Sequence, residues 1–314
     1  MRAPYVVHDI FYPGESPQIP AKKLNTRGTK DMEVKNALSF MNATGVIKFN
    51  MTNNYMFRYI LQEYPRVLKG LICALLHLET EHVKSVEIKN PINLAGDVAG
   101  KEFILDIKVM LNDETLINLE MQVLNEYNWP ERSLSYLCRA YDQLYRGQKY
   151  EEALPVIHIG FLDFTLHPES PEFYATYQML NVKNHLLYSD KFTLSVVDLN
   201  QTRLATEEDK KYRIDYWARI FKAKVWEELQ MMAKENDYMQ EAIEALYVAN
   251  ADEIVRQQCI AREDAERRER TLERNQRLLQ EELKKKVEEL EGKDKELEEK
   301  DKELERLRKL LASK

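Results

Sequence analysis

"FILDIKVMLNDETLINLEMQV", residues 103–123, reads as two apolar runs joined by a polar turn. Apolar and polar residues alternate in both runs, which is typical of β-strands that place one face in a core. Asp106, Glu120 and Gln122 occupy polar positions among Leu, Ile, Met and Val. The stretch therefore predicts a β-hairpin with two carboxylates and an amide on one face.

The register of this hairpin follows from the alternation and the turn. The two apolar faces must coincide, because a slip of one residue would bury the carboxylates in the apolar core. The turn residues Asn-Asp-Glu suggest a three-residue loop centred on Asp113. This loop places Asp106 opposite Glu120, and Lys108 opposite Asn118.

The facing carboxylates have two interpretations that the spacing leaves open. Like charges directly opposite each other destabilise a sheet. Two carboxylates held close together suit a hard divalent cation, which prefers oxygen ligands. Asp106 and Glu120 are therefore candidate metal ligands. The alternative is a polar, solvent-facing surface on which Lys108 relieves the repulsion.

The segments around the hairpin predict an α/β fold in the order helix, strand, strand, strand, helix, strand. Pro65 is expected to open a second helix at its first turn, and Gly147 to end the helix after the hairpin. The expected elements are two helices in 56–78, a strand in 82–94, the hairpin, a helix from 129 to Gly147, and a buried strand in 155–166. Two further strands are expected in 173–183 and 192–199, followed by helices over 207–250.

Composition and pattern suggest four parts of the chain. We expect an N-terminal arm (1–44), a core (45–205), a helical appendage (206–260) and a charged helical tail (261–314). The tail carries 17 Lys and Arg and 17 Asp and Glu, so the formal net charge of −7 belongs to the rest of the chain. DNA contact would therefore need a local basic patch.

The tail repeats leucine every seven residues: Leu283, Leu290, Leu297, Leu304 and Leu311. Such a repeat is typical of a coiled coil and predicts a weak homo-oligomer. The companion seam positions are mostly charged, and Glu–Lys pairs three and four apart can support a single helix instead. The pattern leaves both states open.

Nothing in the sequence indicates export or membrane insertion. The N-terminus has no long apolar run, and no stretch approaches the ~18 apolar residues of a membrane helix. The three cysteines, Cys73, Cys138 and Cys259, lie far apart and form no disulfide framework. We expect a soluble, cytoplasmic protein without a membrane partner.

Several segments together resemble the PD-(D/E)XK nuclease-family transposases, the recombination-promoting nuclease group. "TNNYMFRYIL" (52–61) is similar to the opening helix motif of that group, and "LDIKV" with "INLEMQV" is similar to its active-site hairpin. The helix and strand over 129–166 are similar to its Arg–Tyr helix and the strand that follows. The resemblance runs from about residue 46 to about 265.

The resemblance implies a restriction-endonuclease-like αβββαβ core and metal-dependent cleavage of DNA. Asp106 and Glu120 would ligate Mg²⁺ or another divalent cation, and Gln122 stands where the wider superfamily has a catalytic Lys. Lys108, on the same expected face, is a candidate for the missing charge. The supporting or DNA-facing residues implied by the resemblance are Asn54, Arg132, Tyr136 and Gln143.

These residues support two hypotheses about function. The first is a Mg²⁺-dependent DNA endonuclease associated with transposition or recombination. The second is a catalytically weak nuclease fold that acts as a DNA-binding or assembly module. Asn54, where the group often has Asp, motivates the second hypothesis together with Gln122 and the leucine repeat.

Overall fold

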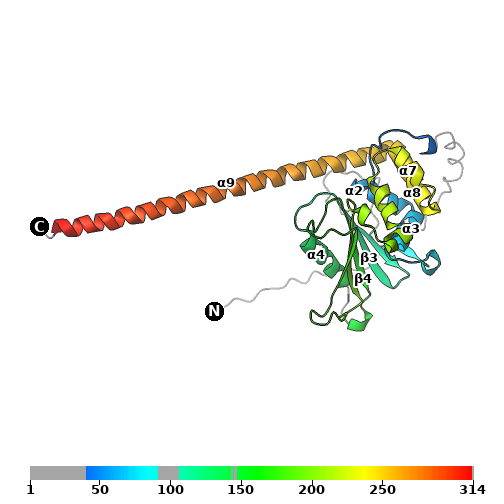
Figure 1. Cartoon of the computed structure of the whole chain (residues 1–314), viewed down its shortest axis with the longest axis horizontal. Helices are drawn as coiled ribbons and strands as arrows, with labels where there is room; N and C mark the ends of the chain where they lie inside the picture. Colours follow the sequence, from blue (N-terminus) through cyan, green and yellow to red (C-terminus); the bar gives the residue numbers. More distant parts are fainter. Residues whose placement is uncertain (1–39, 91–105, 143, 145–146, 313–314) are drawn as a thin grey trace, which may run out of the picture. The chain divides into compact units, whose positions relative to one another are not determined.

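A mixed β-sheet that includes β3 and β4 lies between the helices of the core (Figure 1). Its strand order in the described residues is β1-β2-β3-β4-β6-β5. The computed structural model describes residues 40–90, 106–142, 144 and 147–312. The strands are β1 Val86–Ile88, β2 Ile107–Leu111, β3 Thr115–Gln122, β4 Val156–Leu162, β5 Tyr174–Gln178 and β6 Phe192–Asp198. The predicted α/β class and element order are therefore confirmed.

The hairpin has the predicted register. Lys108 pairs with Asn118, and Ile107 pairs with Leu119, in an antiparallel ladder. Asn112 and Asp113 adopt positive φ values of 53° and 59° in the turn. Asn and Asp tolerate this left-handed conformation better than most residues, so the turn chemistry supports the register.

Helices cover both faces of the sheet (Figure 1). The larger apolar cluster joins one face to α2, α3, α6 and α8, while α4 covers the other face with a smaller cluster. The helices are α2 Asn54–Glu63, α3 Pro65–Leu75, α4 Trp129–Tyr141, α5 Glu207–Lys211, α6 Ile214–Lys222, α7 Trp226–Met232, α8 Asp237–Ala251 and α9 Glu253–Ala312. Short 3-10 turns lie at Phe40–Asn42, Thr80–His82, Tyr150–Glu152 and Thr202–Leu204.

Local signals account for the helix ends near the hairpin. The Asn53 side chain accepts hydrogen bonds from the backbone N–H groups of Tyr55 and Met56 and so caps α2. Pro65 opens α3, as predicted. The prediction that α4 continues to Gly147 is wrong: the backbone leaves the helix at Asp142, with φ −81° and ψ 68°.

Residues Phe40–Lys314 form one structural unit. The first turns of α9 contribute the buried residues Val255 and Cys259 to the larger cluster, and the leucines from Leu272 to Leu307 are exposed. The division into 45–205, 206–260 and 261–314 stays a prediction, and nearly all of the predicted arm lies outside the described residues. No helix in the described ranges combines the length and apolar character needed to span a membrane.

Candidate functional site

The polar face of the hairpin is buried, so the interpretation as a solvent-facing surface is wrong. Strand β3 lies between β2 and β4, and α4 packs over the face that carries its polar side chains. Asp106, Asn118, Glu120 and Gln122 have exposed fractions of 7%, 1%, 5% and 6%. Burying this many polar groups is costly unless each finds a partner or a ligand.

Asp106 lies one residue before β2, and the register that pairs Ile107 with Leu119 places it opposite Glu120. Its backbone carbonyl accepts hydrogen bonds from the guanidinium of Arg58 and from Nδ2 of Asn90, the latter at 2.9 Å. Its carboxylate oxygen Oδ2 is buried and has no hydrogen-bond partner. The backbone is therefore held firmly while one carboxylate oxygen stays unpaired.

Glu120 lies in the middle of the sheet and faces α4. Its Oε1 accepts a hydrogen bond of 2.8 Å from Nε of Arg132, which projects from α4. Its Oε2 is buried without a hydrogen-bond partner, and His158 Nε2 lies 3.6 Å away. Each predicted metal ligand thus keeps one oxygen free of hydrogen bonds.

Burial shifts the pKa of both carboxyl groups. It raises the pKa of Asp106, against the opposing effects of Lys108 and Arg58. It also raises the pKa of Glu120, although Arg132 opposes the shift and the charge of Asp106 adds to it. The two groups interact electrostatically, as expected of side chains that face one site.

Arg58 is a site residue that the sequence reasoning missed. It is fully buried on α2, and its guanidinium also donates to the carbonyl and the side-chain oxygen of Asn90 and to Gln62. Burial lowers its pKa to about 10, so it stays charged near neutral pH. The sequence feature that could have identified Arg58 is a charged residue between Phe57 and Ile60 in a largely apolar helix.

His158 is a second missed site residue. Its Nδ1 lies 2.9 Å from Nδ2 of Asn118; with the amide in this orientation, Nδ1 accepts and Nε2 carries the proton toward Glu120. Burial lowers the pKa of His158 to about 4. The contact with Glu120 is therefore between a neutral ring and a carboxyl group rather than an ion pair at neutral pH.

Arg132 and Tyr136 form one layer of α4 above these groups. The Arg132 guanidinium lies over the Tyr136 ring at 5.4 Å, and that ring stacks on His158 at 6.0 Å. Burial raises the pKa of Tyr136. The stack holds Arg132 where it can orient Glu120.

Gln122 and Lys108 complete the polar face. Gln122 Nε2 donates to the carbonyl of Leu124 at 3.0 Å, while its Oε1 is buried without a partner. Lys108 is partly exposed, and its positive charge opposes the rise in the pKa of Asp106. That Lys108 replaces the charge that the amide of Gln122 cannot supply stays a prediction.

Asn54 connects the site to the start of α9. With its amide oriented to satisfy both groups, Nδ2 donates to the Met121 carbonyl at 3.2 Å and Oδ1 accepts from Arg262 at 3.1 Å. Arg262 forms an ion pair of 2.9 Å with Glu266. Asn54 thus contacts the backbone between Glu120 and Gln122 rather than presenting a free ligand. Gln143 lies outside the described residues.

The donor set that these residues offer consists of oxygen atoms. Within the described ranges, no group of three or more His, Cys, Asp or Glu side chains could hold a metal ion. Two carboxylates and an amide nevertheless direct unpaired buried oxygens to this face. Oxygen donors suit Mg²⁺, which keeps several waters and needs few protein ligands.

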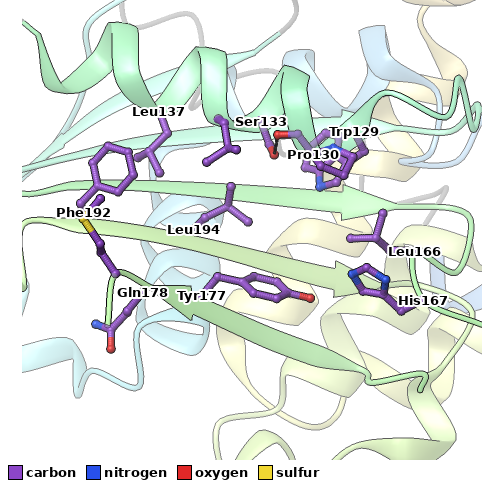
Figure 2. A pocket seen from close by; sticks show the side chains of 12 residues that line it. Trp129, Pro130, Ser133, Leu137, Leu166, His167, Tyr177, Gln178, Phe192 and Leu194 are labelled. Carbon is purple, nitrogen blue, oxygen red and sulfur yellow. Dashed lines mark hydrogen bonds between the residues drawn. The ribbon is translucent and has the colours of Figure 1, made fainter. Parts of the chain in front are cut away.

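A separate apolar pocket of about 360 Å³ lies between α4, β5 and β6 (Figure 2). It is lined by Trp129, Leu137, Tyr177, Phe192 and Leu194, among others. Neither Asp106 nor Glu120 belongs to this lining, so the pocket is distinct from the candidate metal site.

Comparison with known proteins was consistent with this geometry. The family model of the PD-(D/E)XK nuclease family transposase matches residues 51–276. The match includes the hairpin, α4 and the first turns of α9 with Arg262 and Glu266. No curated protein and no solved structure matches the chain.

Proposed function

The chain belongs to the PD-(D/E)XK nuclease family of transposases, and from this membership we propose that it is a metal-dependent endonuclease that hydrolyses DNA phosphodiester bonds. The observation that carries the proposal is the pair Asp106 and Glu120, buried on one face with an unpaired oxygen each. Such oxygens are costly without a ligand, and a divalent cation would supply one.

Asp106 and Glu120 would hold the cation, with the oxygen of Gln122 as a further donor. When bound, a cation held by these residues would polarise a phosphodiester and activate a water. Mg²⁺ is our expectation for the ion because every proposed donor is an oxygen.

The other residues of the site would position these ligands and balance charge. Arg132 orients the Glu120 carboxylate through its hydrogen bond. Arg58 holds the backbone of Asp106. Lys108 supplies positive charge beside the site, where developing negative charge on phosphate needs stabilisation.

The test is nicking of supercoiled plasmid by the full-length protein with Mg²⁺ or with EDTA. Asp106→Asn and Glu120→Gln remove one carboxylate each with little change in shape. Asp113→Asn is the matched control, because it makes the same change in the exposed turn of the same hairpin. We expect Mg²⁺-dependent nicking by the wild type and the control, and loss of nicking in the two site variants. Equal nicking by all four proteins would refute the proposal.

A second function is favoured by the contacts of Glu120 and Asn54. Glu120 is already paired with Arg132, and both polar groups of Asn54 are used within the chain. A weak nuclease fold that acts as a DNA-binding or assembly module would have these features. DNA binding by the wild type without Mg²⁺-dependent cleavage would favour this second function.

A further inference from the structure

Helix α9 carries an apolar stripe in the part of the chain that extends beyond the core contacts. Leu283, Leu290, Leu297 and Leu304 recur every seven residues and are 51–64% exposed. The side chain of Leu311 lies outside the described set. A helix with regularly spaced exposed leucines can bury them by pairing with another helix. Valine at the first seam position of the seven-residue repeat with leucine at the second favours two strands, and Val287 provides this combination.

The charges beside the leucines are ordered by position. With the leucines at position d of the repeat, Lys286, Lys293 and Lys300 occupy position g, and Glu291, Glu298 and Glu305 occupy position e. In a parallel pair of helices, each g residue faces the e residue five positions later in the partner. Lys286 would then face Glu291 of a second copy, with the same pairing for 293 with 298 and for 300 with 305.

The opposite orientation has the wrong charges. In an antiparallel pair, g faces g and e faces e, so lysines would meet lysines and glutamates would meet glutamates. Interhelical charges at these positions set partner choice and orientation. We propose that α9 is a docking surface for a second copy of this chain, in a parallel two-stranded coiled coil over residues 283–305.

The remaining seam position limits the strength of this pairing. Position a holds Val287, Asp294 and Asp301, so two acidic residues would face their own copies across the seam. A polar residue at this position lowers stability while it specifies register. The dimer is therefore expected to depend on protein concentration.

Ion pairs within α9 would compete only weakly with ion pairs between two copies of the helix. Lys286 lies 3.5 Å from Glu282, and Lys309 lies 3.2 Å from Glu305, with all four side chains well exposed. Exposed ion pairs of this kind contribute little and can be exchanged for pairs between copies. A parallel pair also brings the N-terminal ends of two α9 helices together, so two copies of the core lie at the same end.

The test is sedimentation velocity of the full-length protein over a range of concentrations. Lys293→Glu with Lys300→Glu makes four interhelical pairs repulsive in a parallel dimer, and we expect the dimer Kd to rise about tenfold or more. Lys295→Glu with Lys302→Glu is the matched control, because it makes the same change at position b, outside the seam. Circular dichroism checks that both variants keep their helix.

Orientation is tested by a fully exchanged variant that adds Glu298→Lys and Glu305→Lys to Lys293→Glu and Lys300→Glu. In a parallel dimer, this variant associates with itself and excludes the wild type. In an antiparallel dimer, it would associate preferentially with the wild type, which overturns the proposed orientation. A wild-type protein that stays monomeric at all concentrations would overturn the docking surface itself. Neither result depends on nuclease activity.

Discussion

Trp129 packs closely against Gly160, and a substitution of Gly160 tests whether this packing positions α4 over the candidate site. Gly160 lies in β4 and pairs with Glu120 in the β3–β4 ladder, while Trp129 begins α4. A Cβ at position 160 would lie 2.0 Å from Cζ2 and 2.3 Å from Cη2 of Trp129. The indole therefore lies directly on the strand, and only glycine leaves room for it.

Gly160→Ala is expected to destabilise the fold by about 3 kcal/mol, the upper end of the ~1–3 kcal/mol typical of overpacking. Ordinary carbon contacts need about 3.5–4.0 Å, so the ring would have to move by about 1.5 Å. Trp129 is 1% exposed and belongs to the smaller apolar cluster together with Leu116, Leu137 and Leu162, so displacing its ring disturbs the packing between α4 and the sheet.

Urea unfolding followed by circular dichroism measures this cost. Trp129→Phe provides the matched background, because phenylalanine lacks the two atoms that clash. There we expect Gly160→Ala to cost less than about 1 kcal/mol, which gives a coupling of about 2 kcal/mol between neighbouring sites. A cost below about 1 kcal/mol in the wild type, or an equal cost in both backgrounds, would refute the reasoning.

The change should also reach the site. Arg132 lies one helical turn after Trp129, so a displaced α4 would loosen the hydrogen bond to Glu120. In a variant that still folds, divalent-ion binding should weaken along with stability. Unchanged binding would separate the packing of α4 from the geometry of Glu120.

Three further predictions follow from the buried groups and from α9. Burial raises the pKa of Asp106 in the folded protein, so the ionised carboxylate destabilises the fold above that pKa, while the neutral group at low pH does not. Asp106→Asn should therefore raise the Tm of the metal-free protein at pH 7.5. The same substitution should abolish any further increase in Tm when Mg²⁺ is added. A lower Tm would show that the carboxylate is stabilised by its cations instead. Arg58→Met should cost about 3 kcal/mol in urea unfolding, because the buried carbonyl of Asp106 and the partly buried carbonyl of Asn90 lose a charged donor. Arg58→Lys should cost less, since it keeps the charge; equal costs for the two variants would argue against a role for the forked donors of the guanidinium. No atom lies within 4 Å of a Cβ added at Gly292, so Gly292→Ala should stabilise α9 by about 1 kcal/mol without changing the oligomeric state. Thermal unfolding followed by the circular dichroism of the helix measures this gain, and an unchanged melting curve would contradict it.

Local pattern was sufficient for the hairpin and the helices before it. The register of β2 with β3 depends on alternation and on a turn that Asn112 and Asp113 can adopt, and both are properties of adjacent residues. Pro65 marks the start of α3 for the same reason, since its ring restricts its own backbone. Placing Asp106 near Glu120 needed no more than this.

The environment of those carboxylates depended on residues distant in sequence. Arg58 reaches Asp106 from α2, and His158 reaches Glu120 from β4, across sequence separations that no periodicity describes. Packing also decides whether the polar face contacts solvent or α4. The alternation of apolar and polar residues shows that the strand has two different faces, but it does not show what covers each face. The sequence by itself therefore determined the strands, their register and the leucine repeat. Only the tertiary structure decided that the polar face is buried. Burial requires α4 to pack on the sheet, where its Trp129 lies against Gly160 of β4.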